Sequence, residues 1–385
     1  MREGERVTPL ELFFDLVFVL ALTQCTTLMA RSPTWIGLLK GLLALGMLWW
    51  AWTGYAWLTS VVDPEEGSVR LVIFTAMAAM LVAALCVPGA FGGEALLFAC
   101  AYAVVRGAHI ALFTIASRED PALRRSVAGL AASTAIAVGL LFLAAFTAGA
   151  VQLALWGLAL VLDMGGPFLF GADGWKLVPG HFAERHGLIV LIALGESIVA
   201  IGVGARTTID ARVVVAAVLG VIVAACLWWV YFDVTALVAE RRLSQTAEGR
   251  ERNEMARDSY SYLHLPMVAG IALLAVGLKI TLEGDTEPLK LVPTAALLGG
   301  TALYLLAHVA FRLRNVHSLS VRRLVCALAL FALVPITLSA GISSLATLAI
   351  LAAVLSLLIV YEVTRYAEVR ERVRHQGSPG PGPPG

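Results

Sequence analysis

Apolar residues in this chain form long blocks instead of alternating with polar ones. Blocks of about 20 residues, separated by short polar segments, recur from residue 10 to residue 365. About 20 residues at 1.5 Å each cross the ~30 Å hydrocarbon core of a bilayer. Backbone polar groups in that core must be satisfied within a helix. The pattern predicts an all-α polytopic membrane protein with about twelve transmembrane helices, expected at 10–30, 35–58, 69–88, 94–116, 126–148, 151–170, 187–205, 212–238, 261–280, 292–312, 322–342 and 345–365.

Composition agrees with this reading. The chain is 59% hydrophobic and 14% charged, whereas a soluble domain is about 25% charged. The lipid bilayer is therefore the expected environment. The net charge of +1 gives no reason to expect a nucleic-acid partner. The five cysteines all lie in apolar blocks and predict neither a disulfide framework nor a CxxC metal pair.

The positions of Lys and Arg predict the orientation. With the N-terminus inside, 21 of the 28 basic residues fall on cytoplasmic segments, as the positive-inside rule requires. The first apolar stretch is too long for a cleavable signal peptide and carries Glu11 and Asp15. We therefore expect a multi-pass protein of the inner membrane with both termini in the cytoplasm.

Short motifs recur in the same order in the two halves of the chain, with a separation of roughly 170–200 residues. The order predicts two parallel six-helix repeats, an arrangement known among transporters. We expect a first half at 1–170, a cytoplasmic connection at 171–186, a second half at 187–370 and a disordered Pro/Gly-rich tail at 371–385. The matching pairs are VLALTQ at 19–24 with LIALGE at 191–196, LWW at 48–50 with 227–229, AH at 108–109 with 307–308, and RR at 124–125 with 322–323.

Ionisable residues within the apolar blocks are the first candidates for function, since a charge at the bilayer centre costs at least ~2.5–3.5 kcal/mol. Glu196 lies about ten residues into its helix, or roughly 15 Å deep, and Arg106 is similarly central. The other candidates lie between the midplane and the cytoplasmic side. Together they predict a polar cavity that opens to the cytoplasm. These candidates are Asp15, His109, Asp163, Asp233, His264 and His308.

Two sets of these residues share a helix face. Glu11 and Asp15 are four residues apart, and Tyr102, Arg106 and His109 form a stripe at i, i+4 and i+7. A polar stripe of this kind is expected to face the helix bundle.

Structural roles remain open for several of these groups. Arg106 could pair with Glu196 or with Asp163 only to hold the bundle together. Asp163 precedes Gly165, Gly166 and Pro167, which predicts a break in the sixth helix. The alternative for Glu11 is an interfacial residue facing water, for Asp233 a structural ion-pair partner, and for His264 and His308 hydrogen-bonded packing.

Four stretches resemble the low temperature requirement A (LtrA) family of bacterial membrane proteins. They are TPLELFFDLVFV at 8–19, HFAERHGL at 181–188 with LGES at 194–197, WWVYFD at 228–233, and YLHLPMVAG at 262–270. His186 departs from the aromatic or aliphatic residue expected at its position. The family name refers to growth at low temperature and implies no biochemical activity. The resemblance implies that Glu11, Asp15, Glu184, Arg185, Glu196, Ser197, Asp233 and His264 are family-motif positions.

The leading prediction is a secondary transporter or solute pathway with a polar cavity open to the cytoplasm, for which proton coupling is one option. The first alternative is an intramembrane enzyme that acts on a lipid or isoprenoid from the cytoplasmic leaflet. The second is a structural or stress-related membrane protein needed for growth at low temperature. A homo-oligomer is an option under each of these functions. The sequence contains no metal-binding motif or nucleotide loop, and it does not identify a cofactor. Catalytic or proton-coupling roles are assigned to Asp15, Glu196, Asp233 and His264, and binding of a small-molecule or lipid substrate to Glu11, Tyr102, Arg106, His109, Asp163, Glu184, Arg185, Ser197 and His308.

Overall fold

The structure is a computed structural model that describes residues 7–169, 173–204, 210–283 and 287–365. Over these residues it contains twelve helical segments long and apolar enough to cross a membrane, which confirms the all-α polytopic prediction. The first six are α1 (Pro9–Arg31), α2 (Trp35–Leu58), α3 (Gly67–Cys86), α4 (Ala95–Ala116), α5 (Pro121–Ala144) and α6 (Gly149–Leu169), with the short 3₁₀ turn η1 (Val87–Gly89) after α3.

The second six spans are less regular. Two contain a π-helical segment, η2 or η3, and the eighth continues into a separate helix, α9. The elements are α7 (Pro179–Gly204), α8 (Ala211–Phe232), α9 (Thr235–Gln245), α10 (Arg250–Ala256), η2 (Arg257–Tyr262), α11 (His264–Glu283), α12 (Leu291–Thr294), η3 (Ala295–Gly299), α13 (Gly300–Val316), α14 (Val321–Ser339) and α15 (Ser344–Arg365).

Side-chain caps account for several helix starts. The Thr8 side chain accepts a hydrogen bond from the Glu11 backbone, and Glu11 in turn bonds the Thr8 backbone, so α1 begins with a capping box. Asp120 caps α5 and Asp210 caps α8 through their side-chain oxygens. These contacts satisfy backbone N–H groups that the first turn of a helix leaves without partners.

The structure differs from the predicted boundaries mainly around the seventh, eighth and ninth spans, and the ninth begins at Arg250 instead of the predicted 261. α7 begins at Pro179, within the segment expected as a connection, and α8 ends at Phe232, before the predicted 238. Boundaries are hard to place here because polar residues extend the helices beyond the apolar blocks. The predicted disordered tail at 371–385 lies outside the described residues.

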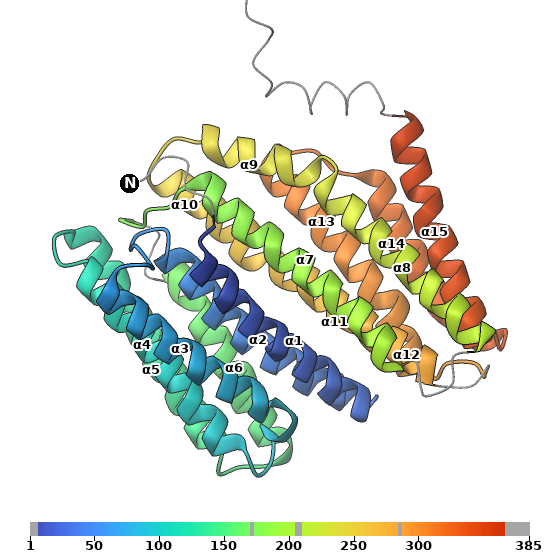
Figure 1. The fold of residues 1–385 in the computed structure, drawn as a ribbon, viewed down its shortest axis with the longest axis horizontal. Coiled ribbons are helices and arrows are strands. Elements are labelled where there is room, and N and C mark those ends of the chain that lie inside the picture. The colour runs from blue at the N-terminus through green and yellow to red at the C-terminus, as the bar shows by residue number, and fades with distance from the viewer. Residues whose placement is uncertain (1–6, 170–172, 205–209, 284–286, 366–385) are drawn as a thin grey trace, which may run out of the picture.

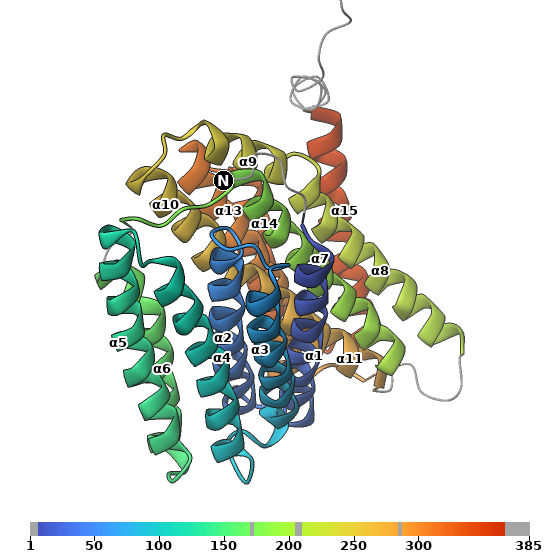
Figure 2. The same ribbon diagram turned by 60° about the vertical axis from the view of Figure 1, so that its left-hand side comes forward.

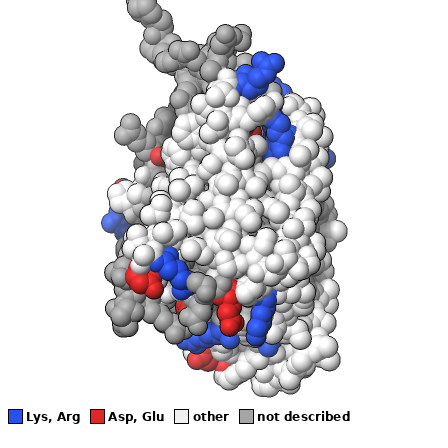
Figure 3. All heavy atoms as spheres, turned by 90° about the vertical axis from the view of Figure 1, so that its right-hand side faces the viewer, with Lys and Arg blue, Asp and Glu red and all other residues white. Residues whose placement is uncertain are grey.

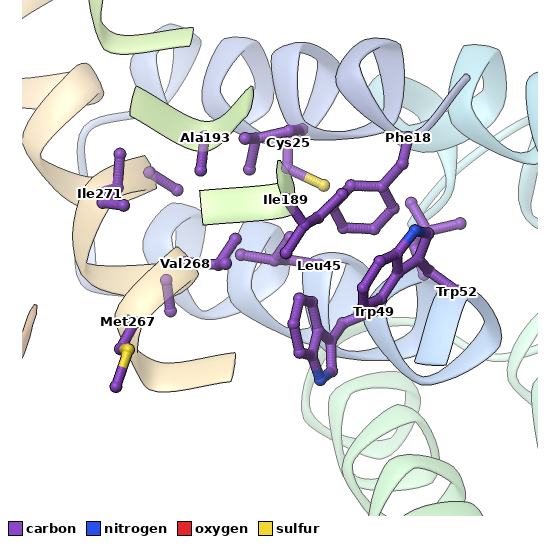
Figure 4. Close-up of a cluster of buried hydrophobic side chains, with 14 of the residues drawn as sticks. Phe18, Cys25, Leu45, Trp49, Trp52, Ile189, Ala193, Met267, Val268 and Ile271 are labelled. Carbon is purple, nitrogen blue, oxygen red and sulfur yellow. The ribbon is translucent and has the colours of Figure 1, made fainter. Parts of the chain in front are cut away.

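Helices α1–α6 form one group and α7–α15 another, as Figures 1 and 2 show. The two groups meet where α1 and α2 pack against α7 and α11. Figure 4 shows the apolar core at this junction, where Phe18 of α1 and Trp49 of α2 lie near Ile189 of α7 and Val268 of α11. All four side chains are fully buried. The start of α1 lies at the end of the bundle that carries α9 and α10, called here the α9–α10 end.

The outer surface is apolar, as lipid contact requires. Figure 3 shows a broad uncharged area on one face, with charged side chains gathered toward its edges. Large apolar side chains are exposed over the surface of the bundle, and examples are Leu357 at 69% and Phe146 at 76%. Contiguous apolar surface of this kind is rare on soluble monomers and normal on a membrane protein.

Candidate functional site

The first cluster of charged side chains joins α7 to α1 and α2. Arg185 Nη2 lies 2.7 Å from Asp15 Oδ1, and Arg185 Nη1 lies 3.5 Å from Glu11 Oε1. His181 Nε2 lies 2.9 Å from Glu11 Oε2, and Trp52 Nε1 donates to Asp15 Oδ1 at 2.7 Å. All five side chains are at least nine-tenths buried. Glu11 is therefore an ion-pair partner within the bundle, and the interpretation that it faces water is wrong.

The second cluster lies between α4, α5 and α6. Arg106 Nη2 contacts Asp163 Oδ1 at 2.8 Å, and the Thr134 hydroxyl donates to the same carboxylate oxygen at 2.8 Å. Tyr102 donates to Asp163 Oδ2 at 2.8 Å, and His109 Nδ1 lies 3.3 Å from Arg106 Nη1. The predicted stripe on α4 thus faces the bundle, and Asp163 accepts three hydrogen bonds.

Glu196 lies apart from both clusters. Its two carboxylate oxygens accept hydrogen bonds from Thr23 at 2.5 Å and Thr26 at 2.8 Å, both on α1. The expected alternative of an Arg106–Glu196 pair is wrong, because Asp163 occupies the Arg106 guanidinium. Lys279 of α11 acts on Glu196 only electrostatically, at longer range. Among the described residues, Glu196 is a buried carboxylate held by neutral hydroxyls.

The predicted break in the sixth helix is also wrong, since α6 continues to Leu169 with Pro167 inside it. Proline removes only the one backbone donor that would bond the carbonyl four residues earlier, and Pro167 stands in the last turn. Carbonyls of this turn bind side chains from the ninth span. Tyr262 donates to the Met164 carbonyl and Arg257 to that of Pro167.

The second half contains a buried cluster of histidine and tyrosine. His264 bonds the Tyr231 hydroxyl through Nε2 and the Ser259 carbonyl through Nδ1, both at 2.9 Å. This agrees with the packing alternative for His264. The His308 ring lies against Tyr231, with ring centroids 5.6 Å apart. The ring of His186, at the position where an aromatic or aliphatic residue is expected, lies with its centroid 5.2 Å from that of His264.

The remaining predicted site residues lie outside these clusters. Ser197 donates to the Leu194 carbonyl of its own helix at 2.6 Å, a helix-internal contact. Glu184 is exposed and accepts a bond from the Val7 backbone at 3.3 Å. Asp233 is the C-cap residue of α8 and is half-buried. The thirteen predicted residues are thus spread over several clusters and do not line one cavity.

A pocket lies beside the Arg106 cluster, near the α9–α10 end, and its empty volume of about 480 Å³ includes space that is open to the outside. Its walls come from both halves of the chain, since Arg257 and Ser261 belong to η2. π-helical segments are frequent at functional sites, and two tryptophans of α2 hold this one. Trp49 donates to the Ser261 carbonyl and Trp57 to its hydroxyl, at 2.8 and 2.9 Å. The pocket is lined by Trp50, Thr53, Gly54, Trp57, Arg106, His109, Leu130, Pro167, Trp175, Asn253, Arg257 and Ser261.

Sequence reasoning missed residues that complete these clusters. His181 pairs with Glu11, although the sequence identifies it only as the first residue of the family stretch at 181–188. Thr23, Thr26 and Thr134 carried no signal, because threonine is common in transmembrane helices and its partners lie far away in the sequence. Arg257 was counted only among the basic residues of a cytoplasmic loop.

The clusters suit ion pairing, proton exchange and binding of polar solutes. Within the described ranges, no three His, Cys, Asp or Glu side chains are grouped so as to hold a metal ion. The carboxylates of Asp15 and Asp163 each contact an arginine, whereas the Glu196 carboxylate accepts hydrogen bonds from two threonine hydroxyls.

Comparison with known proteins agrees with the resemblance noted in the sequence. The family model of the bacterial low temperature requirement A protein (LtrA) matches residues 6–360. An uncharacterized protein of Rhizobium meliloti (strain 1021) is 31% identical over 311 residues, which cover 77% of this chain and 74% of the relative. No solved structure matches. The chain is a multi-pass membrane protein that belongs to the LtrA family.

Proposed function

We propose that this protein is a secondary transporter or solute pathway in which Glu196 couples proton movement to solute movement. The observation that carries the proposal is the contrast among the buried carboxylates. Glu11, Asp15 and Asp163 each contact an arginine, whereas the Glu196 carboxylate contacts two threonine hydroxyls.

The contrast matters because an arginine fixes the charge of a buried carboxylate, while hydroxyls do not. A hydroxyl donates to a carboxylate and equally accepts from a protonated carboxyl. Glu196 of α7 and its partners Thr23 and Thr26 of α1 lie on the helices that join the two halves. Loss or gain of its proton would therefore change the junction between the halves, as proton coupling requires.

Helix packing supports the two parallel repeats that such a mechanism would use, with halves at 1–170 and 187–370 and the connection at 171–186. In the first half α1 packs on α2 and α3, and α3 packs on α4. In the second half α7 packs on α8 and α11, and α11 packs on α13. In two such repeats α1 would correspond to α7, α2 to α8, α3 to α11 and α4 to α13.

Corresponding helices also share a histidine–tyrosine contact. The ring of His109 on α4 lies 5.5 Å from that of Tyr55 on α2, and His308 on α13 lies 5.6 Å from Tyr231 on α8. The Tyr55 hydroxyl donates to the Val105 carbonyl between the first pair of helices. These matches favour a common origin of the halves over chance similarity of Leu/Ala-rich helices.

We place the protein in the bacterial inner membrane with both termini in the cytoplasm, on the distribution of Lys and Arg. In this orientation the pocket beside Arg106 lies toward the cytoplasm. The solute would enter there, between walls contributed by both halves.

An intramembrane enzyme is the second candidate, and the gathering of ionisable groups toward one side of the membrane favours it. His109 would be the acid–base group nearest the pocket, because Asp163 is occupied by three donors. The third candidate is a structural or stress-related role, alone or in a homo-oligomer. In that role the buried charged clusters would only stabilise the fold.

Reconstitution separates these functions. Purified protein in proteoliposomes with a trapped pH dye should move protons when a panel of ions and organic solutes is presented outside. Glu196→Gln should abolish that movement, and the exposed matched variant Glu248→Gln should not. Chemical conversion of an added lipid without net movement would support the enzyme instead. No movement and no conversion would support the structural role.

A further inference from the structure

The pocket beside Arg106 has a defined chemical character. Three tryptophans, Trp50, Trp57 and Trp175, supply aromatic surface, and Leu130 and Pro167 add aliphatic surface. The basic side chains on its walls are Arg106, His109 and Arg257, and no acidic side chain is among the described lining residues. An apolar wall with convergent basic groups is typical of a site for an organic ion.

The charges around the pocket do not cancel. Asp163 compensates Arg106 at 2.8 Å. Asp258, however, is shared by Arg257 at 2.8 Å and Arg314 at 3.0 Å, which leaves one cation in excess at the η2 wall. The Arg257 guanidinium also lies 4.1 Å from the centre of the Phe168 ring.

Side chains of the pocket wall carry buried polar atoms without hydrogen-bond partners. They are Nε2 of His109 and, on three other side chains, the indole Nε1 of Trp50, the hydroxyl of Thr53 and Nε of Arg106. The three side chains are exposed by 5%, 2% and 1%. Buried polar groups normally have partners, and an unpaired one destabilises the folded protein. Two of the three are obligate donors, so a group that accepts hydrogen bonds would satisfy them.

We propose that the pocket binds an amphipathic oxyanion, whose charged group takes hydrogen bonds from Trp50, Thr53 and Arg106 while its apolar body lies against the tryptophan rings. This inference rests on the proposed function in one respect: it names the substrate class of the same site. A soluble organic acid and an anionic lipid headgroup share this chemistry.

Gly54 gives the basic groups their place on the wall. A Cβ atom at Gly54 would lie 2.8 Å from His109 Cε1 and 3.0 Å from Arg106 Nη1. The approach to His109 is closer than real Cβ atoms show, so a side chain at this position would shift the His109 ring, and the Arg106 guanidinium would have to give by a few tenths of an ångström. Gly54→Ala should therefore weaken oxyanion binding without removing any polar group.

Calorimetry on the purified full-length protein tests the proposal. Benzenesulfonate is the probe, benzenesulfonamide its neutral counterpart of similar shape, and inorganic sulfate the anion without an apolar body. Benzenesulfonate should bind at least about tenfold more tightly than either. Equal affinity for benzenesulfonamide would contradict the requirement for a negatively charged group. Equal affinity for sulfate would contradict the requirement for an apolar body.

Two conservative variants connect binding to this pocket. Trp50→Phe and Thr53→Val should each weaken benzenesulfonate binding about tenfold, as expected for one hydrogen bond to a charged group. Trp156→Phe is the matched control, because Trp156 is buried against Phe91 and Phe98 and does not line the pocket. If Trp50→Phe and Trp156→Phe bind equally well, the site is elsewhere and the proposal fails.

Lipid and soluble sources are separated in nanodiscs. If the natural ligand is a lipid, dioleoyl phosphatidate in the disc should compete with benzenesulfonate, and phosphatidylcholine should not. If it is soluble, benzenesulfonate affinity should be the same in both lipids. Binding without solute-driven proton movement would overturn the transport function and leave this inference intact. Proton movement without benzenesulfonate binding would overturn this inference and leave the transport function intact.

Discussion

Arg185 of α7 lies with its Nη2 atom 2.7 Å from Asp15 Oδ1 of α1, and both side chains are at least 99% buried. The contact joins the two halves of the chain at the α9–α10 end. About 15 Å further along α7, Glu196 meets α1 again through two threonines. The same helix pair therefore carries one junction made by an ion pair and one in which a carboxylate accepts hydrogen bonds from two hydroxyls.

Removal of one partner from the first junction should destabilise the protein strongly. Arg185→Gln leaves the Asp15 and Glu11 carboxylates buried without their guanidinium, and breaking a buried ion pair costs about 3–5 kcal/mol. Thermal unfolding in detergent should show a large loss for this variant. The triple variant with Asp15→Asn and Glu11→Gln should recover much of it, because the uncompensated charges are then gone. A stable Arg185→Gln protein would contradict the ion-pair assignment.

Asp163 should behave in the same way within the first half. Asp163→Asn keeps one acceptor oxygen, for either Tyr102 or Thr134, and leaves the Arg106 guanidinium, 1% exposed, without its counter-charge. We expect a loss of about 3–5 kcal/mol and partial rescue by Arg106→Gln in the same chain. Thermal stability of the two single variants and the double variant measures the coupling. Additive single effects would show that the contact contributes little.

The fold was more predictable than the site, for a physical reason. Blocks of about 20 apolar residues leave the backbone no choice but helix in a bilayer, so twelve spans follow from the sequence. Partner choice depends on which helices meet. From the sequence, either Glu196 or Asp163 could be the ion-pair partner of Arg106. The packing of α4 with α5 and α6 determines that it is Asp163. The π-helical segment that brings Arg257 to the pocket has no comparable sequence signature.

The orientation proposed above can be tested by cysteine labelling. On a background without Cys25, Cys86, Cys100, Cys226 and Cys326, a cysteine at Glu248 should resist an impermeant thiol reagent in intact cells. It should react after the cells are opened, because the Glu248 side chain is 71% exposed. The exposed Gly93, in the turn between α3 and α4, gives the matched position on the opposite side. Labelling of the 248 cysteine from outside would exclude the orientation.

Glu196→Gln is expected to separate stability from function. Unlike Asp163, Glu196 neutralises no arginine among its described contacts, so the amide leaves no buried cation without a partner. Its Oε1 can accept from one of Thr23 and Thr26, and at most one hydrogen bond of about 0.5–1.5 kcal/mol is lost. The variant should therefore unfold close to the wild-type temperature and reach the membrane at normal levels.

Transport should nevertheless fail, because glutamine cannot exchange a proton. Glu196→Asp is the matched variant: it keeps the titratable group but shortens its reach to α1, so it should retain partial, altered activity. Solute-driven proton movement in proteoliposomes is the measurement, beside thermal unfolding of the same preparations. A Glu196→Gln protein that unfolds several degrees lower would indicate a structural role, and one that is stable and fully active would remove Glu196 from the coupling mechanism.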